Sequence, residues 1–203
     1  MLDPLESLRY MKEKDVKSVL DIGAHIGEYS ARVKQLFPYM EVFLIEGNPY
    51  CENYLEQRGL PFTIACLSEE EKEIGLYMNP VNAICTGTSY YKETTHHYDN
   101  SIKLTVNTKK LDDVVDREFD FIKMDTQGSE IDIMKGGTKT LAAAKFVQIE
   151  LSLIEYNKGA PLKDEVVAYM ESIGFKPDKM VQVQYESYDT TKPIIQEDWI
   201  FAR

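Results

Sequence analysis

Short apolar runs alternate with helical patterns, and this alternation constrains the fold more than any other feature of the sequence. In the first third of the chain, three runs are typical of buried strands: KSVLDIG (17–23), EVFLIE (41–46) and FTIACL (62–67). Between them, one pattern predicts a helix over 28–37 that Pro38 stops, and another predicts a helix that opens at Pro49 and closes at Gly59. Such continuously apolar strands indicate a parallel sheet covered on both faces by helices.

The same alternation returns in the second half of the chain. The predicted order is a strand FDFIKMD (119–125), a helix over 129–143, a strand KFVQIELS (145–152) and a helix over 162–174. The runs 175–187 and 193–203 follow without a helix between them, so we expect two antiparallel strands. A short amphipathic helix is expected over 1–15, and its apolar positions are Leu2, Leu5, Leu8 and Met11. We therefore predict one domain over residues 1–203.

Residues 73–108 interrupt the alternation. EIGLYM (73–78) and SIKLTVNT (101–108) predict strands, and the polar stretch 79–101 has no helical period. An irregular segment of this length inside a compact domain is typical of a lid or binding loop, so we expect it to fold over the carboxyl rim of the sheet. Its tyrosines are Tyr90, Tyr91 and Tyr98. We expect them to pack the loop onto the domain, with stacking against a ligand as the alternative.

Composition narrows the classes of partner. The 203-residue chain carries a net charge of −11, which argues against general binding to nucleic acid or to an anionic membrane. The first residues lack the pattern of a signal peptide, and no apolar run reaches the ~20 residues of a membrane span. The scattered Cys51, Cys66 and Cys85 do not form a disulfide framework or a metal motif, and we expect all three to be small buried hydrophobes. We therefore expect a cytoplasmic protein.

The first predicted strand leads directly into a glycine loop, VLDIGAHIGEYS (19–30). Its spacing is Gly23-x-x-x-Gly27, whereas a dinucleotide loop has G-x-G-x-x-G and needs its second glycine for the approach of a pyrophosphate. The imidazole of His25 would crowd a pyrophosphate there, and no Gly-Lys-Ser/Thr follows to make a P-loop. A ligand with an amino acid and a nucleoside fits better. Asp21 would hold a network near its ammonium group, and the glycines would let the chain turn closely against it.

Polar residues also end the next two predicted strands. Glu46 lies about 20 residues beyond the loop, where a carboxylate accepts hydrogen bonds from both ribose hydroxyls in dinucleotide folds. The third strand ends in Cys66-Leu67-Ser68, which would line an adenine edge. Each feature alone also fits a plain tight turn with a solvated glutamate. Their order on consecutive strands favours the ligand site.

At these positions the chain resembles class I S-adenosylmethionine-dependent methyltransferases, and among them the FkbM family. VLDIGAHIGEYS resembles the family's first motif and LIEGNPYCENYL its acidic motif. The most specific segment, LDDVVDREFDFIKMDTQGSEIDIMKGG (111–137), matches a family pattern of Leu-Asp, a strand ending Lys-x-Asp, and x-Glu/Gln-Gly-x-Glu. VQIELSLIEYNKGAP and QEDWIFAR also resemble family segments, so the resemblance covers roughly residues 16–203. The chain departs from the family at Gln127, where many members have Glu, and at His25, where Asn is common.

The resemblance implies a fold and a cofactor. The fold is a three-layer Rossmann-like α/β sandwich whose seven-stranded, mostly parallel sheet has the order 3-2-1-4-5-7-6, with the last strand antiparallel and inserted between strands five and six. The cofactor is S-adenosyl-L-methionine, with S-adenosyl-L-homocysteine as the product. The implied cofactor-binding residues are Asp21, Gly23, Ala24, His25, Gly27, Glu28, Glu46, Gly47, Asn48, Leu67, Ser68, Asp125 and Gln127.

The resemblance also suggests the reaction, O-methylation of a hydroxyl of a sugar, a glycan or a related small molecule, with loop 79–101 binding this acceptor. Such a hydroxyl is a poor nucleophile and needs proton removal during attack. The candidate catalytic groups are Asp125, Glu150, His96 and His97. Glu130 is expected to make structural hydrogen bonds, and no metal is expected. Two alternatives stay open: a non-catalytic cofactor-binding module, for which the Gln127 departure leaves room, and a nicotinamide-dependent oxidoreductase.

Overall fold

A seven-stranded sheet forms the centre of the computed structural model, which describes residues 6–203. The strand order is β3-β2-β1-β7-β8-β10-β9. These strands are β1 (Ser18–Ile22), β2 (Glu41–Glu46), β3 (Phe62–Ile64), β7 (Phe121–Met124), β8 (Phe146–Ser152), β9 (Lys176–Tyr185) and β10 (Ile194–Ala202). β10 is antiparallel to β8 and β9, and the other pairs are parallel. The expected order, with the last strand inserted between the fifth and sixth, is confirmed.

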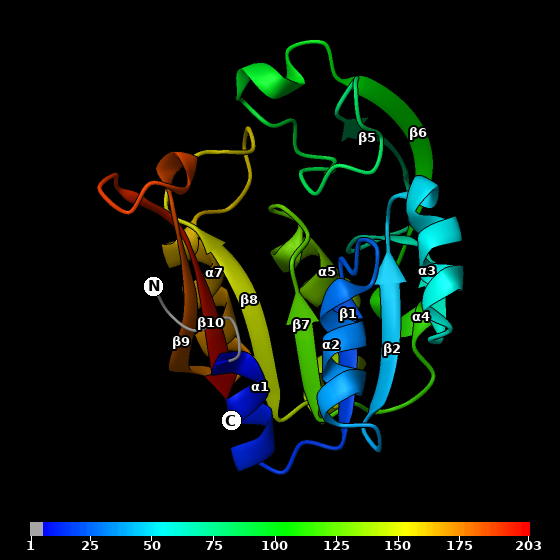
Figure 1. Ribbon diagram of the computed structural model, residues 1–203, viewed down its shortest axis with the longest axis vertical. Coiled ribbons are helices and arrows are strands. Elements are labelled where there is room, and N and C mark those ends of the chain that lie inside the picture. Colours follow the sequence, from blue (N-terminus) through cyan, green and yellow to red (C-terminus); the bar gives the residue numbers. More distant parts are fainter. Residues whose placement is uncertain (1–5) are drawn as a thin grey trace.

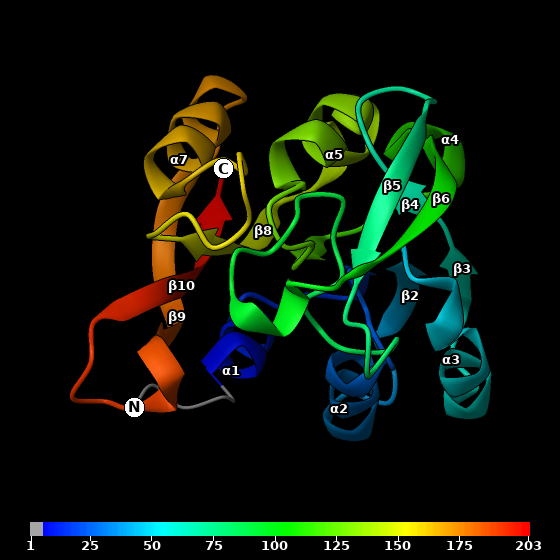
Figure 2. The ribbon, with the colours of Figure 1, turned by 90° about the horizontal axis from the view of Figure 1, so that it is seen from above.

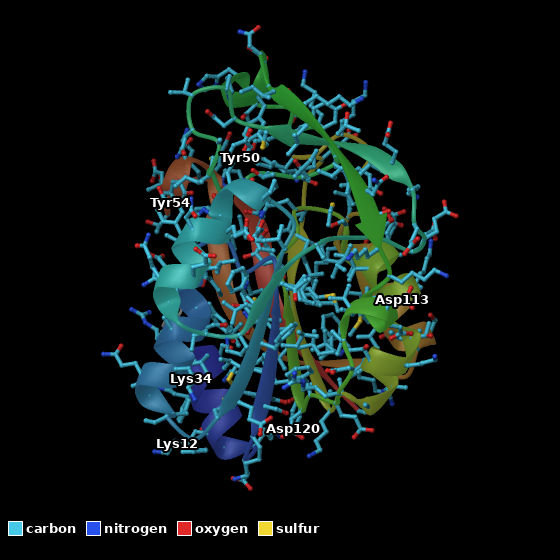
Figure 3. The ribbon with its side chains drawn as sticks, turned by 90° about the vertical axis from the view of Figure 1, so that its right-hand side faces the viewer. Lys12, Lys34, Tyr50, Tyr54, Asp113 and Asp120 are labelled. Atoms are coloured by element: carbon cyan, nitrogen blue, oxygen red, sulfur yellow. The ribbon has the colours of Figure 1, made fainter. Side chains whose placement is uncertain are left out.

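Helices cover both faces of this sheet. They are α1 (Glu6–Glu13), α2 (Glu28–Leu36), α3 (Glu52–Arg58), α4 (Leu111–Val114), α5 (Glu130–Gly136), α6 (Thr138–Ala143) and α7 (Lys163–Ser172), with short 3-10 turns η1 (Pro49–Cys51), η2 (His96–Tyr98) and η3 (Glu186–Tyr188). Figure 2 shows α1, α2 and α3 on one face, and α4, α5 and α7 on the other. In Figure 3, Lys12, Lys34 and Tyr54 mark the first face and Asp113 the second.

The central strands β1 and β7 are buried on both faces, as their apolar sequences predicted. Val19 and Phe121 pack in one hydrophobic cluster, whereas Leu20 packs in a second cluster on the opposite face. The same alternation brings Asp21 and Lys123 to the Val19 face, and the register of β1 and β7 places them directly opposite each other. Asp21 and Lys123 thus form a pair of ionisable side chains inside the core, near the carboxyl ends of β1 and β7.

The third predicted strand, 62–67, is in fact divided between two sheets. The chain turns at Ala65, whose N–H donates to the Glu46 carbonyl, and the next residues leave the main sheet. They form β4 (Cys66–Leu67), which joins β5 (Glu73–Met78) and β6 (Ile102–Lys109) in a three-stranded sheet of order β4-β6-β5. The interrupting segment therefore contributes a small second sheet, which lies above β2 in Figure 1.

Two predicted helices differ in their bounds. The helix over 129–143 is divided into α5 and α6 near Gly136 and Gly137, and each glycine permits a close approach: a Cβ at Gly136 would lie 2.2 Å from the Ser68 carbonyl oxygen. The amino-terminal helix ends at Glu13 rather than residue 15. Its predicted Leu8 and Met11 are buried, whereas its first two leucines, at positions 2 and 5, lie outside the described residues. No helix in the described part of the chain is long and apolar enough to cross a membrane.

Candidate active site

A cavity of about 590 Å³ lies at the carboxyl ends of the parallel strands, and its size is in the range of small-molecule sites. Loop 79–101 crosses above these ends, at the top of Figure 1. The side of the cavity over β1 and β2, here the glycine-loop side, is lined by Gly23, His25, Glu46, Gly47, Asn48, Ala65, Cys66 and Leu67. The side over β10 and β9, here the glutamine side, is lined by Glu93, Tyr98, Tyr156, Gln182, Gln184 and Gln196. Asp125, Gln127 and Glu150 lie between the two.

The glycine loop is shaped by neighbouring protein atoms. Gly23 has φ +78°, and a Cβ there would lie 1.9 Å from the Asp125 carbonyl oxygen. Gly27 has φ +75°, and a Cβ there would lie 3.2 Å from side-chain carbons of Leu44 and Leu55. Neighbouring protein atoms therefore already require a glycine at both positions, and Gly23 also lines the cavity. His25 also adopts a left-handed φ of 52°.

Glu46 is buried at the end of β2, where the sequence placed a ribose acceptor. Its Oε2 accepts the His25 N–H at 2.6 Å, and its Oε1 accepts the Asn48 N–H at 2.7 Å. Burial raises the pKa of this carboxyl, while the two backbone donors oppose the rise. A carboxylate has about four lone-pair sites, so each oxygen keeps one for a ligand hydroxyl.

Two carboxyl groups at the centre of the cavity share one amide donor. Asp125 follows β7, and Glu150 lies two residues before the end of β8. Gln127 Nε2 donates to Asp125 Oδ1 at 3.1 Å and to Glu150 Oε2 at 2.9 Å, and Gln196 Nε2 also donates to Glu150 Oε2 at 2.9 Å. Gln127 therefore acts as a double donor, which a glutamate at this position would not supply. Burial, followed by the nearby charge of Asp125, raises the pKa of Glu150 well above its ordinary value.

A buried lysine lies behind these carboxyl groups. Lys123 Nζ is 3.2 Å from Asp125 Oδ2 and 3.9 Å from Asp21 Oδ1. Its pKa is raised by Asp125, Asp21 and Asp198, although burial opposes the rise. Burial raises the pKa of Asp21, and burial with the charge of Asp125 raises that of Asp198 to about 6. Lys123 thus has two aspartates as ion-pair partners, and the carboxyl groups around it outnumber this one ammonium group.

Loop 79–101 is fixed to both sides of the cavity. At its start, Asn48 Nδ2 donates to the Ala83 carbonyl at 2.6 Å. In its middle, Ser89 Oγ donates to the Gln127 carbonyl at 2.9 Å. Tyr90 and Tyr91 both donate to Asp132 Oδ2 of α5, at 2.9 and 3.1 Å. The expected packing of these two tyrosines onto the domain is confirmed.

Comparison with known proteins assigns this arrangement to a family. Residues 21–177, more than half of the chain, match the methyltransferase FkbM domain. The chain belongs to the FkbM methyltransferase family. This is a family of S-adenosylmethionine-dependent methyltransferases, and the FkbM domain is therefore an enzyme of that class. The alternative of a nicotinamide-dependent oxidoreductase is wrong.

Individual relatives of this FkbM domain are distant. It is 26% identical to the 2-O-methyltransferase NoeI of Sinorhizobium fredii (strain NBRC 101917 / NGR234), over 72% of this chain and 68% of that protein. The crystal structure of methyltransferase FkbM from Methylobacillus flagellatus KT is similar with a TM-score of 0.58 at 16% identity, over 93% of this chain but 44% of that one. Precorrin-6y C5,15-methyltransferase from Geobacter metallireducens GS-15 has a TM-score of 0.52 at 12% identity, over 100% of this chain and 90% of that one. These structural likenesses show a shared fold.

The FkbM domain brings most of the expected site residues into one cavity. Those that line it are Gly23, His25, Glu46, Gly47, Asn48, Leu67, Asp125, Gln127 and Glu150. The expected site residues that do not line the cavity are Asp21, Ala24, Gly27, Glu28, Ser68 and His96. Asp21 and Ser68 are instead fully buried, and the Glu28 side chain is 76% exposed. The side chain of His97 is outside what the structure describes.

Two other expectations, on Glu130 and on the three cysteines, are tested by the local geometry. Glu130 Oε1 accepts from the Thr126 N–H and hydroxyl, at 3.0 and 2.9 Å, so its expected structural role is confirmed. Cys51 and Cys66 are buried, and burial raises the pKa of each thiol to about 12. Cys85 was expected to be buried as well, but it is half-buried and lines the cavity. Among the described residues, no group of three His, Cys, Asp or Glu is arranged to hold a metal ion.

Sequence reasoning placed Glu93 and Tyr98 in the expected acceptor loop but missed the other residues of the glutamine side. Gln182 and Gln184 come from β9, Gln196 from β10, and Glu93 and Tyr156 from two loops. One signal was present: VQVQY alternates valine with glutamine, which places both glutamines on one face of a strand. Nothing in the sequence placed that face beside Glu150, because this depends on the pairing of β10 between β8 and β9.

Proposed function

We propose that the chain transfers a methyl group from S-adenosylmethionine to a hydroxyl of a sugar, a glycan or a related small molecule. Support comes from its relative NoeI, whose name is 2-O-methyltransferase, and from a cavity in which amides, phenols and carboxyl groups can hold hydroxyls. The observation that carries the proposal is the position of two carboxyl groups between the two sides of one cavity.

The glycine-loop side has the chemistry that the cofactor needs. Glu46 is buried there with its two oxygens held by backbone N–H groups, so it is oriented to accept from both ribose hydroxyls. Next to it, Ala65, Cys66 and Leu67 supply an apolar wall for a nucleobase. S-adenosylmethionine supplies an electrophilic methyl group on a cationic sulfur. The carboxyl groups beside the site favour that cation.

Glu150 and Asp125 are the groups proposed to take the proton from the acceptor hydroxyl. Both line the cavity, whereas His96 does not. Glu150 has the raised pKa that general bases commonly show, because such bases work best with a pKa near the operating pH. Its Oε2 accepts from Gln127 and Gln196, which fixes the carboxyl group. Gln127 thereby has a positioning role and leaves two carboxyl groups in place for catalysis.

Incubation with methyl-labelled S-adenosylmethionine and a panel of sugars, glycosides and glycans tests the proposal. We expect transfer to an oxygen of at least one acceptor, together with binding of S-adenosylhomocysteine in calorimetry. Glu150→Gln should lower kcat by about 100-fold with little change in cofactor affinity. The matched control Glu171→Gln, on the exposed face of α7, should retain wild-type turnover. Cofactor binding without transfer to any acceptor would contradict the proposed reaction.

A further inference from the structure

The glutamine side of the cavity is built on one face of three neighbouring strands. The register places Glu150 of β8 opposite Asp198 of β10, and Asp198 opposite Gln182 of β9. Gln196 lies in the adjacent row, opposite Gln184. Residues paired in this way share a face of the sheet. The strand pairing therefore forms a continuous polar surface whose amides can donate to and accept from ligand hydroxyls.

Loop 79–101 completes this surface with a buried phenol. Tyr98 lines the cavity and is 2% exposed, and its hydroxyl has no hydrogen-bond partner of ordinary geometry among the described residues. Burial and then the neighbouring Cys85 thiol raise the pKa of this hydroxyl. Glu93, also buried, reaches the same place: a Cβ at Gly87 would lie 2.6 Å from Glu93 Oε2 and 2.6 Å from Tyr98 Oη. A buried polar atom without a partner is costly, so this hydroxyl points to a ligand group that would satisfy it.

The charges around this surface have one sign. Glu93, Asp125 and Glu150 line the cavity, and no lysine or arginine of the described chain does. Lys123 does not line the cavity, and its ammonium group is already close to two aspartates, Asp125 at 3.2 Å and Asp21 at 3.9 Å. Burial is the main cause of the raised pKa values of Glu150 and Asp198, and the negative charge of Asp125 adds to both rises. Clefts lined by one sign of charge concentrate ligands of the opposite sign and repel those of the same sign.

We propose that the glutamine side binds an uncharged or positively charged polyhydroxy acceptor, such as a neutral glycoside or an amino sugar, and excludes sugar phosphates, nucleotide sugars and uronic acids. This inference rests on the proposed function and gives its acceptor a charge class. A single like charge about 6 Å from one carboxylate, at an effective dielectric constant of about 20, weakens binding by about 100-fold.

The field can be measured without knowing the acceptor, because Cys85 lines the cavity. The Cys85 thiol is treated separately with two methanethiosulfonate reagents, the cationic trimethylammonium-ethyl and the anionic sulfonatoethyl compound. The rate with the cation is divided by the rate with the anion, and this ratio is normalised to the same ratio for free 2-mercaptoethanol. Buried Cys51 and Cys66 contribute little, and a Cys85→Ser variant identifies the signal. We expect the normalised ratio to favour the cation by about 10-fold or more. Glu93→Gln should reduce it, whereas the control Glu171→Gln on α7 should not; a ratio of one or less would overturn the inference.

A second measurement uses matched acceptors with labelled S-adenosylmethionine. Each sugar is offered as its methyl glycoside, its amino derivative, its phosphate and its nucleoside diphosphate. The neutral or amino member should exceed the phosphate in kcat/KM by about 100-fold. Tyr98→Phe, which removes only the hydroxyl, should raise KM for the acceptor and leave cofactor affinity unchanged. The control Tyr91→Phe, on the same loop but outside the cavity lining, should not raise that KM.

The two measurements separate the inference from the proposed function. Faster transfer to an anionic acceptor than to its neutral partner would overturn the charge class while retaining methyl transfer. No transfer to any member, together with a cation-favouring ratio at Cys85, would count against the proposed function and support the charge class of the site.

Discussion

Replacing Lys123 with methionine should destabilise the fold through a buried charge. Lys123 and Asp21 face each other across β1 and β7, and their side chains are 10% and 0% exposed. Asp21 Oδ2 accepts from the Ser30 hydroxyl at 2.7 Å, but its Oδ1 has no hydrogen-bond partner among the described residues. The ammonium group 3.9 Å away therefore supplies the charge that compensates this oxygen. Lys123→Met removes that compensation and keeps a side chain of similar length.

The expected loss is about 3–5 kcal/mol of unfolding free energy near pH 8, as for other buried pairs that lose one partner. The sign of the pH dependence follows from Asp21, whose pKa burial raises and Lys123 lowers. Without Lys123 that pKa rises further, so the folded variant keeps a proton that the unfolded chain releases near pH ~3.9. The stability that this bound proton gives the folded variant is present below that pH. It is lost as the pH rises through the pKa of Asp21 in the folded variant, by up to about 1.4 kcal/mol per pH unit. The destabilisation should therefore be smaller at about pH 5.5 than at about pH 8.

Urea unfolding at both pH values, followed by circular dichroism, tests this reasoning. Lys139→Met, at an exposed position of α6, is the matched control and should change stability by less than about 0.5 kcal/mol. The double variant Lys123→Met/Asp21→Asn should recover much of the loss, since no uncompensated charge then remains at this pair. A loss below about 1 kcal/mol, or one that does not change with pH, would refute the assigned role of this pair.

Three further outcomes follow from the site. Glu46→Ala leaves ligand hydroxyls and two backbone N–H groups unpaired, and calorimetry should register a loss of about 1–3 kcal/mol in affinity for S-adenosylhomocysteine. Gly23→Ala places a methyl group 1.9 Å from the Asp125 carbonyl oxygen and should lower Tm far more than Gly59→Ala, where no atom lies within 4 Å; equal melting temperatures would contradict this. If Glu150 is the base, the acidic limb of the plot of kcat against pH lies above the ordinary carboxyl range, and kcat rises with pH through that limb. Asp125→Asn leaves such a limb in place, whereas Glu150→Gln removes it.

The sequence predicted the main sheet because its strands carry their own signal. Val19, Leu20 and Ile22 of β1, like Phe121 and Ile122 of β7, are apolar on both faces and are buried on both faces. Local pattern therefore decided their structure. Only the family resemblance gave the strand order, since spacing along the chain does not say which strands pair.

The polar parts of the site were harder to predict. Glu46 carried a local signal, because a carboxylate at the end of a buried strand needs an explanation. Gln127 looked like a weakened catalytic position, and only its distances to Asp125 and Glu150 reveal a shared donor. Gln196 gave no signal of its own, because its contact with Glu150 spans 46 residues and depends on strand pairing. Long-range pairing is the information that local patterns do not contain.

The position of β10 has a consequence for how the chain assembles. Among the described strands, β9 pairs only with β10, yet β10 must also lie against β8. If β9 paired with β8 first, β10 would have no place in the sheet. A short connection from Tyr185 to Ile194 joins β9 and β10. We therefore expect these two antiparallel strands to pair with each other first and then to pair with β8 as one hairpin. Gln196 reaches Glu150 only at that docking step, so the polar centre of the cavity is completed after β1, β2 and β3 have been synthesised and late in folding.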